Sequence, residues 1–108
     1  MKHTYNFYGL KADTLTAPDP LPTGRVNVRY EFIADEPGKR ATGGKTLLFV
    51  NDRQVADGRL QYTVAFRFSL YAGMDIGKDN GLTVASSYAK KAPFPFTGEI
   101  EKVVFDLK

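Results

Sequence analysis

The chain has 108 residues, which fits one domain, and its 43% hydrophobic and 25% charged residues argue against a disordered segment. It has no cysteine and one histidine, which excludes disulfides, cysteine nucleophiles and zinc sites built from Cys and His. The net charge of +3 is scattered, so we expect no nucleic-acid partner, and no apolar run approaches the ~20 residues of a membrane span.

The first 24 residues predict a short edge strand followed by a loop. Residues 5–8 predict the strand, and no apolar signal-peptide region precedes them, so we expect a cytoplasmic chain as given. His3 is expected at a frayed end, in a structural role. Residues 14–24 contain three alternating prolines, which favour an extended loop and exclude a central strand.

The middle of the chain predicts strands with a period of two. Residues 25–32 alternate, with apolar side chains on one face and Arg25, Asn27, Arg29 and Glu31 on the other. A hairpin follows, in which residues 46–50 and 54–60 are joined by a turn at Asn51-Asp52-Arg53.

Two more strands are predicted in the second half. Residues 60–70 alternate and form one long strand or two strands broken near Thr63. Residues 98–107 form the last strand, and residues 71–97 form a long loop whose apolar residues predict that it is packed. No segment has a helical period. The pattern therefore predicts an all-β fold, an antiparallel β-sandwich of jelly-roll type, as a single domain over residues 1–108.

Two motifs suggest ligands but have simpler explanations. The glycine-rich stretch 38–46 lacks the first glycine of a phosphate-binding loop and precedes a strand pattern, which indicates a glycine turn. Asp75 and Asp79 are weak candidates for calcium binding. The residues around them supply too few oxygens, so we expect no metal and no other cofactor, and a turn in which Asp and Asn cap their own backbone.

The segment Pro93-Phe94-Pro95-Phe96 is the most distinctive apolar element. Two prolines stiffen it, so Phe94 and Phe96 either plug one end of the sandwich or dock a partner, and we favour the plug. Together with Tyr88, these rings are the candidate contact with a ligand or partner.

An ordered set of short motifs resembles the C-terminal domain of bacterial arylsulfatases. The set includes Tyr5-Asn6-Phe7-Tyr8-Gly9-Leu10, Pro20-Leu21-Pro22-Thr23-Gly24, Tyr30-Glu31-Phe32, Val50-Asn51-Asp52, Phe66-Arg67-Phe68-Ser69-Leu70, Asp75-Ile76-Gly77-Lys78-Asp79-Asn80-Gly81 and Pro93-Phe94-Pro95-Phe96-Thr97-Gly98. The resemblance implies a non-catalytic β-sandwich that packs against a sulfatase catalytic domain. The formylglycine precursor and the Pro-Ser-Arg context of that catalytic domain are absent here, so no catalytic residue carries over.

The expected role is therefore association or scaffolding, with a sulfatase catalytic domain or a second copy as partner. We expect a homodimer, because a domain separated from its enzyme keeps apolar surface that needs a cover. The alternative is a small lectin-like module that binds an anionic or sulfated carbohydrate through Arg25 and Arg29, and a third possibility is a remnant without activity.

Overall fold

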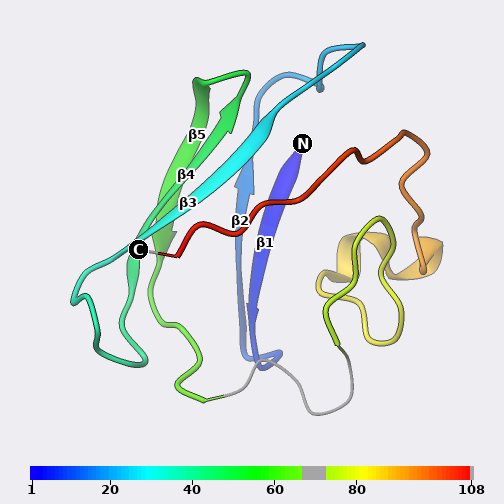
Figure 1. The fold of residues 1–108 in the computed structure, drawn as a ribbon. Helices are drawn as coiled ribbons and strands as arrows, with labels where there is room; N and C mark the ends of the chain where they lie inside the picture. Colours follow the sequence, from blue (N-terminus) through cyan, green and yellow to red (C-terminus); the bar gives the residue numbers. More distant parts are fainter. Residues whose placement is uncertain (67–72, 108) are drawn as a thin grey trace. The chain divides into compact units, whose positions relative to one another are not determined.

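The structure, a computed structural model, describes residues 1–66 and 73–107. The chain divides into two compact units, Met1–Phe68 and Ser69–Lys108. Five strands, all in the first unit, and one short 3-10 helix form the regular structure of the described residues (Figure 1). The predicted all-β class is confirmed, and the strands form two antiparallel sheets. The jelly-roll arrangement and the single domain over residues 1–108 stay predictions.

The first sheet is a two-stranded hairpin. β1 (Lys2–Phe7) pairs with β2 (Lys11–Thr16) in antiparallel register. The connecting turn needs left-handed backbone at Gly9 (φ 74°), whose N–H donates to the Asn6 side-chain oxygen at 2.7 Å. β2 overlaps the predicted loop at residues 14–16, so that prediction is wrong there. The first proline is Pro18, after β2 has ended at Thr16. Every residue of β2 therefore has a backbone N–H for the ladder.

The second sheet has the order β3-β4-β5 and is antiparallel throughout. β3 spans Val28–Ala34, β4 Gly44–Val50 and β5 Arg53–Leu60. The predicted hairpin is confirmed. Asn51 and Asp52 both have positive φ (49° and 64°), the backbone of the tight turn that matches the right-handed strand twist.

The two sheets of the first unit contact each other through their inner faces. The His3 ring of β1 stacks on Tyr30 of β3, with centroids 3.8 Å apart, and β2 packs near Gly58 of β5. The core between them is small. Among the described residues, the buried side chains are Ala17, Thr46, Leu48 and Leu60.

Two predicted strands are corrected. β5 ends at Leu60, and residues 61–66 are not a strand, while residues 67–70 lie outside the described residues. Leu60 pairs with Gly44, the first residue of β4, so the ladder has no neighbour beyond that point. The described residues of the predicted strand 98–107 form no strand either, because no neighbouring strand pairs with them.

Residues 73–107, the described part of the second unit, form loops around the 3-10 helix η1 (Ser86–Lys91). No residue from 73 to 107 is buried. The expectation of a packed loop is therefore wrong for its apolar side chains, which are exposed at Met74, Ile76, Leu82 and Val84. Without a strand ladder or long helix to hold them together, these residues build no enclosed core of their own.

Candidate functional site

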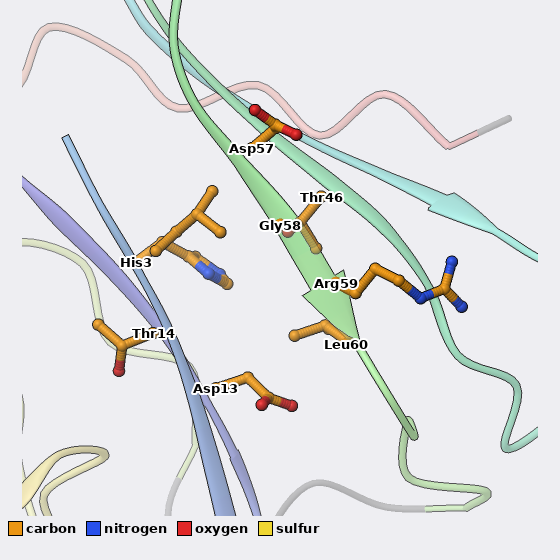
Figure 2. A pocket seen from close by; sticks show the side chains of 9 residues that line it. His3, Asp13, Thr14, Thr46, Asp57, Gly58, Arg59 and Leu60 are labelled. Carbon is orange, nitrogen blue, oxygen red and sulfur yellow. The ribbon is translucent and has the colours of Figure 1, made fainter.

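A pocket of about 170 Å³ lies between the two sheets of the first unit (Figure 2). The hairpin β1–β2 and the strands β4 and β5 form its walls. Its lining residues are His3, Asp13, Thr14, Leu15, Thr46, Asp57, Gly58, Arg59 and Leu60. Because side chains alternate along a strand, the residues that share the inner faces here are His3, Asp13, Leu15, Thr46, Gly58 and Leu60.

Thr46 is the most buried residue of the pocket. It is 1% exposed, and its hydroxyl has no hydrogen-bond partner. Gly58, directly opposite on β5, keeps this space open, since a Cβ there would lie 2.5 Å from Leu15 Cδ1 and 3.6 Å from Thr46 Oγ1. A buried hydroxyl without a partner costs about 1–3 kcal/mol, so this position is energetically poor without a bound water or ligand.

His3 is held in the wall of the pocket as a neutral ring. Burial lowers the pKa of its imidazole, and the stacked Tyr30 has its own pKa raised to about 12 by burial and by nearby Tyr5. The expectation that His3 lies at a frayed end is wrong. Met1, two residues before His3, accepts a hydrogen bond from the Ala17 N–H at 2.9 Å, which extends the hairpin ladder to the first residue.

The charges around the pocket do not favour an anion. The Asp13 carboxylate forms an ion pair with the Lys11 ammonium, 3.5 Å away. The Arg59 guanidinium is turned away from His3 (Figure 2) and is hydrogen-bonded to Asp35. The volume is also below the roughly 300 Å³ at which small-molecule sites begin. It is large enough to hold several waters.

The predicted sugar-binding arginines are placed separately. Arg29 lies on the outer face of β3, where it donates to Glu31 at 2.5 Å and covers the Phe49 ring at 4.1 Å. Arg25 precedes β3 and is exposed. A lectin-like face needs an aromatic ring that is open to the sugar beside its cations. Here the guanidinium of Arg29 covers one face of the Phe49 ring, so a sugar cannot stack on that face. The lectin-like alternative stays a prediction.

The two acids of the second unit are engaged within their own loop. The Asp75 carboxylate accepts hydrogen bonds from the Asn80 N–H (2.8 Å) and side-chain amide (3.1 Å), and these bonds lower its pKa. The Asp79 carboxylate accepts from the Tyr88 hydroxyl and the Val84 N–H. Within the described residues no three His, Cys, Asp or Glu side chains are grouped as a metal site requires.

The aromatic candidates form a small exposed cluster in the same unit. Tyr88 stacks on Phe94 with ring centroids 5.6 Å apart, and the Phe96 ring lies against Gly98. Phe94 and Phe96 are each more than half exposed, and the choice between the plug and a partner contact stays a prediction. The rings are held by the loop's own contacts, including the bond from Tyr88 to Asp79.

Sequence reasoning missed the inner wall of the pocket, namely His3, Asp13 and Thr46. The signal was present for Asp13, because Lys11, Asp13 and Leu15 alternate with small or polar residues directly after the Gly9 turn. Thr46 gave no such signal, since a threonine in an apolar strand looks the same with or without a hydrogen-bond partner.

Comparison with known proteins gives no match among family models, curated proteins or solved structures. Within the residues described, no helix has the length and apolar character that a membrane crossing requires. The exposed apolar side chains are thus the feature of this chain that points most strongly to a role.

Proposed function

We propose that this chain is a non-catalytic association domain that covers its apolar surface by packing against a protein partner. One observation supports it: the described residues include 19 exposed large hydrophobic side chains but only three buried hydrophobic residues. Single exposed apolar residues are ordinary, and we take this excess over the buried core as apolar area that a partner covers.

Each unit exposes apolar side chains of its own. The side chains that are at least three-quarters exposed are Leu10 and Phe66 in the first unit and Leu82 and Leu107 in the second. Each Å² of apolar surface removed from water stabilises a complex by roughly 25 cal/mol before the costs of association. Burying part of this surface therefore offers a large driving force for association.

The resemblance to arylsulfatase C-terminal domains suggests the partner. Such a domain packs against a sulfatase catalytic domain. The other partner that we expect to bury the apolar side chains is a second copy of this chain. The resemblance also supports a non-catalytic role, because in that family the chemistry belongs to the catalytic domain.

A binding titration tests the proposed function. The probe is a bacterial arylsulfatase catalytic domain from which its own C-terminal domain has been removed. We expect a one-to-one complex that is weakened in the variant Leu10→Gln and unaffected in Asp19→Asn, which changes an exposed charge in the proline-rich loop. A chain that binds neither this domain nor itself would contradict the proposal.

The purified chain is expected not to hydrolyse para-nitrophenyl sulfate. It has no cysteine and no Pro-Ser-Arg context, and its one imidazole is stacked between the sheets. Release of nitrophenol that persists through purification and is lost on His3→Ala would show that the chain is an enzyme.

A further inference from the structure

The pocket between the two sheets contains a polar group that the first unit leaves without a partner. All of the residues that line the pocket belong to that unit, Met1–Phe68. Thr46 is 1% exposed and its hydroxyl has no hydrogen-bond partner, whereas buried polar groups are normally paired. The lining residues Thr14 and Asp57 are exposed, so the pocket reaches the surface and a small solute can enter it. These features define a site for a ligand that forms hydrogen bonds.

The other polar groups on the inner faces are able to accept hydrogen bonds. The Asp13 carboxylate lies 3.5 Å from the Lys11 ammonium, beyond the roughly 2.7–3.2 Å of an N–H···O hydrogen bond, so its acceptor sites stay open. Burial lowers the pKa of His3, so at about pH 7 its neutral ring keeps one nitrogen without a proton. Figure 2 shows both side chains extending from the hairpin β1–β2 toward β5, into the same space.

These acceptors favour a small cation with several N–H donors. A primary ammonium group carries three donors, no acceptor and one positive charge, which complements the Asp13 carboxylate. An anion would be repelled by that carboxylate, and an apolar group would leave the Thr46 hydroxyl unpaired. The volume of about 170 Å³ limits the ligand to about six non-hydrogen atoms, since a cavity of about 150 Å³ holds benzene.

We propose that this pocket binds a small primary alkylammonium ion. Its N–H groups donate to the Asp13 carboxylate, the Thr46 hydroxyl and the unprotonated nitrogen of His3. Its short alkyl chain packs against Leu15 and Leu60, the apolar side chains of the inner wall. The site goes beyond the proposed association function and does not depend on it.

A titration of the full chain followed by two-dimensional amide NMR tests the site. The probe is n-propylammonium chloride at fixed pH and ionic strength. The amide signals of His3, Asp13 and Thr46 should shift along one saturating curve, with a Kd of roughly 1–10 mM, because so small a ligand has few atoms for contact. Two control compounds, n-propanol, which lacks the charge, and tetramethylammonium, which lacks the N–H donors, should bind about tenfold more weakly.

Substitutions on the two faces of the strands separate the pocket from general charge effects. Asp13→Asn should raise the Kd of n-propylammonium about tenfold and Thr46→Val about fivefold, since each removes an acceptor. Thr46→Val removes a hydroxyl that has no partner in the ligand-free chain, so weaker binding in this variant cannot come from unfolding. The matched control is Asp57→Asn, which changes the same charge on the outer face of β5, where Figure 2 shows the carboxylate turned away from the other lining side chains. It should change the Kd by less than about twofold.

Three results would overturn the inference. Equal effects of Asp13→Asn and Asp57→Asn would mean that the cation is attracted by surface charge alone. Equal binding of n-propylammonium and n-propanol would mean that the acceptors do not take part. The absence of a saturable shift at His3, Asp13 and Thr46 would mean that the pocket holds only water. Each result leaves the proposed association function intact, because binding to a protein partner is measured separately.

Discussion

His3 links the packing of the two sheets to pH. Burial lowers the pKa of His3 in the folded chain. His3 of the unfolded chain therefore becomes protonated near pH 6.5, while His3 of the folded chain becomes protonated only at a lower pH. The unfolded state therefore binds more protons as the pH falls below this value, and stability decreases in that direction.

Because His3 is the only histidine, this effect is separable from the others. We expect urea denaturation at fixed protein concentration to show lower stability at pH 5.5 than at pH 7.5, values on either side of the ordinary histidine pKa. The variant His3→Phe, which retains a ring for Tyr30 to stack on, should lose most of this difference. An unchanged pH dependence in His3→Phe would contradict the assignment.

Thr46 supplies a second test at the residue scale. Replacing it with valine exchanges a buried hydroxyl that has no partner for a methyl group of similar size. We expect Thr46→Val to stabilise the chain by about 1 kcal/mol in chemical denaturation, since no hydrogen bond is lost and the desolvation penalty is removed.

The control for this change is Thr14→Val. Thr14 is exposed, and its hydroxyl lies 3.1 Å from that of Thr4, so its replacement should change stability by less than about 0.5 kcal/mol. If Thr46→Val were strongly destabilising, a ligand or an ordered water in the pocket would have to be holding the hydroxyl.

Among the elements, the hairpin β4–β5 depends on its two turn residues. Asn51 and Asp52 both occupy left-handed backbone, and the Asn51 side-chain oxygen also accepts from the Asn27 N–H at 2.9 Å. Of the two turn residues, Asp52 is therefore the one whose replacement by glycine relieves backbone strain without removing the Asn51 hydrogen bond.

We expect Asp52→Gly to stabilise the chain by about 0.5–1 kcal/mol in thermal or urea denaturation, because glycine adopts positive φ without strain. Asp19→Gly, in the loop before Gly24, should instead be neutral or slightly destabilising, since Asp19 has no positive φ to relieve. Loss of stability in Asp52→Gly would mean that the turn differs from the one described.

This hairpin also shows what the sequence could predict. Asn51-Asp52 between two apolar runs is a local signal, and alternation identified most of β3 for the same reason. The predicted strands at 61–66 and 98–107 failed because alternation says that a segment suits a pleated surface, not that a neighbour exists to pair with it. β2 was not predicted, and its last three residues, 14–16, were assigned to the proline loop.

The candidate site was less predictable than the strands. Arg29 is where the alternation placed it, on the polar face of β3, but its contacts with Glu31 and Phe49 depend on pairing with β4. The inner pocket depends on two sheets meeting, and that contact joins His3 to residues more than 40 positions away along the chain. Local patterns carry no information on such contacts.

At the scale of the whole molecule, the described residues expose many more large apolar side chains than they bury. The first unit buries few side chains between its sheets, and the second, over residues 73–107, buries none. Folding must offset a conformational entropy cost of about 1–2 kcal/mol for each ordered backbone residue, and apolar burial is the main term that does so. Under the proposed association function, a protein partner that covers the exposed apolar side chains would add to this burial.

Sedimentation equilibrium of the whole chain, alone and mixed with an arylsulfatase catalytic domain, tests this account most directly. The chain has a mass of 12.0 kDa. We predict an average mass above this value for the chain alone, rising with concentration through the micromolar range, or a heavier complex in the mixture. A folded chain that sediments as a 12.0 kDa monomer at every concentration and in both samples would contradict the account.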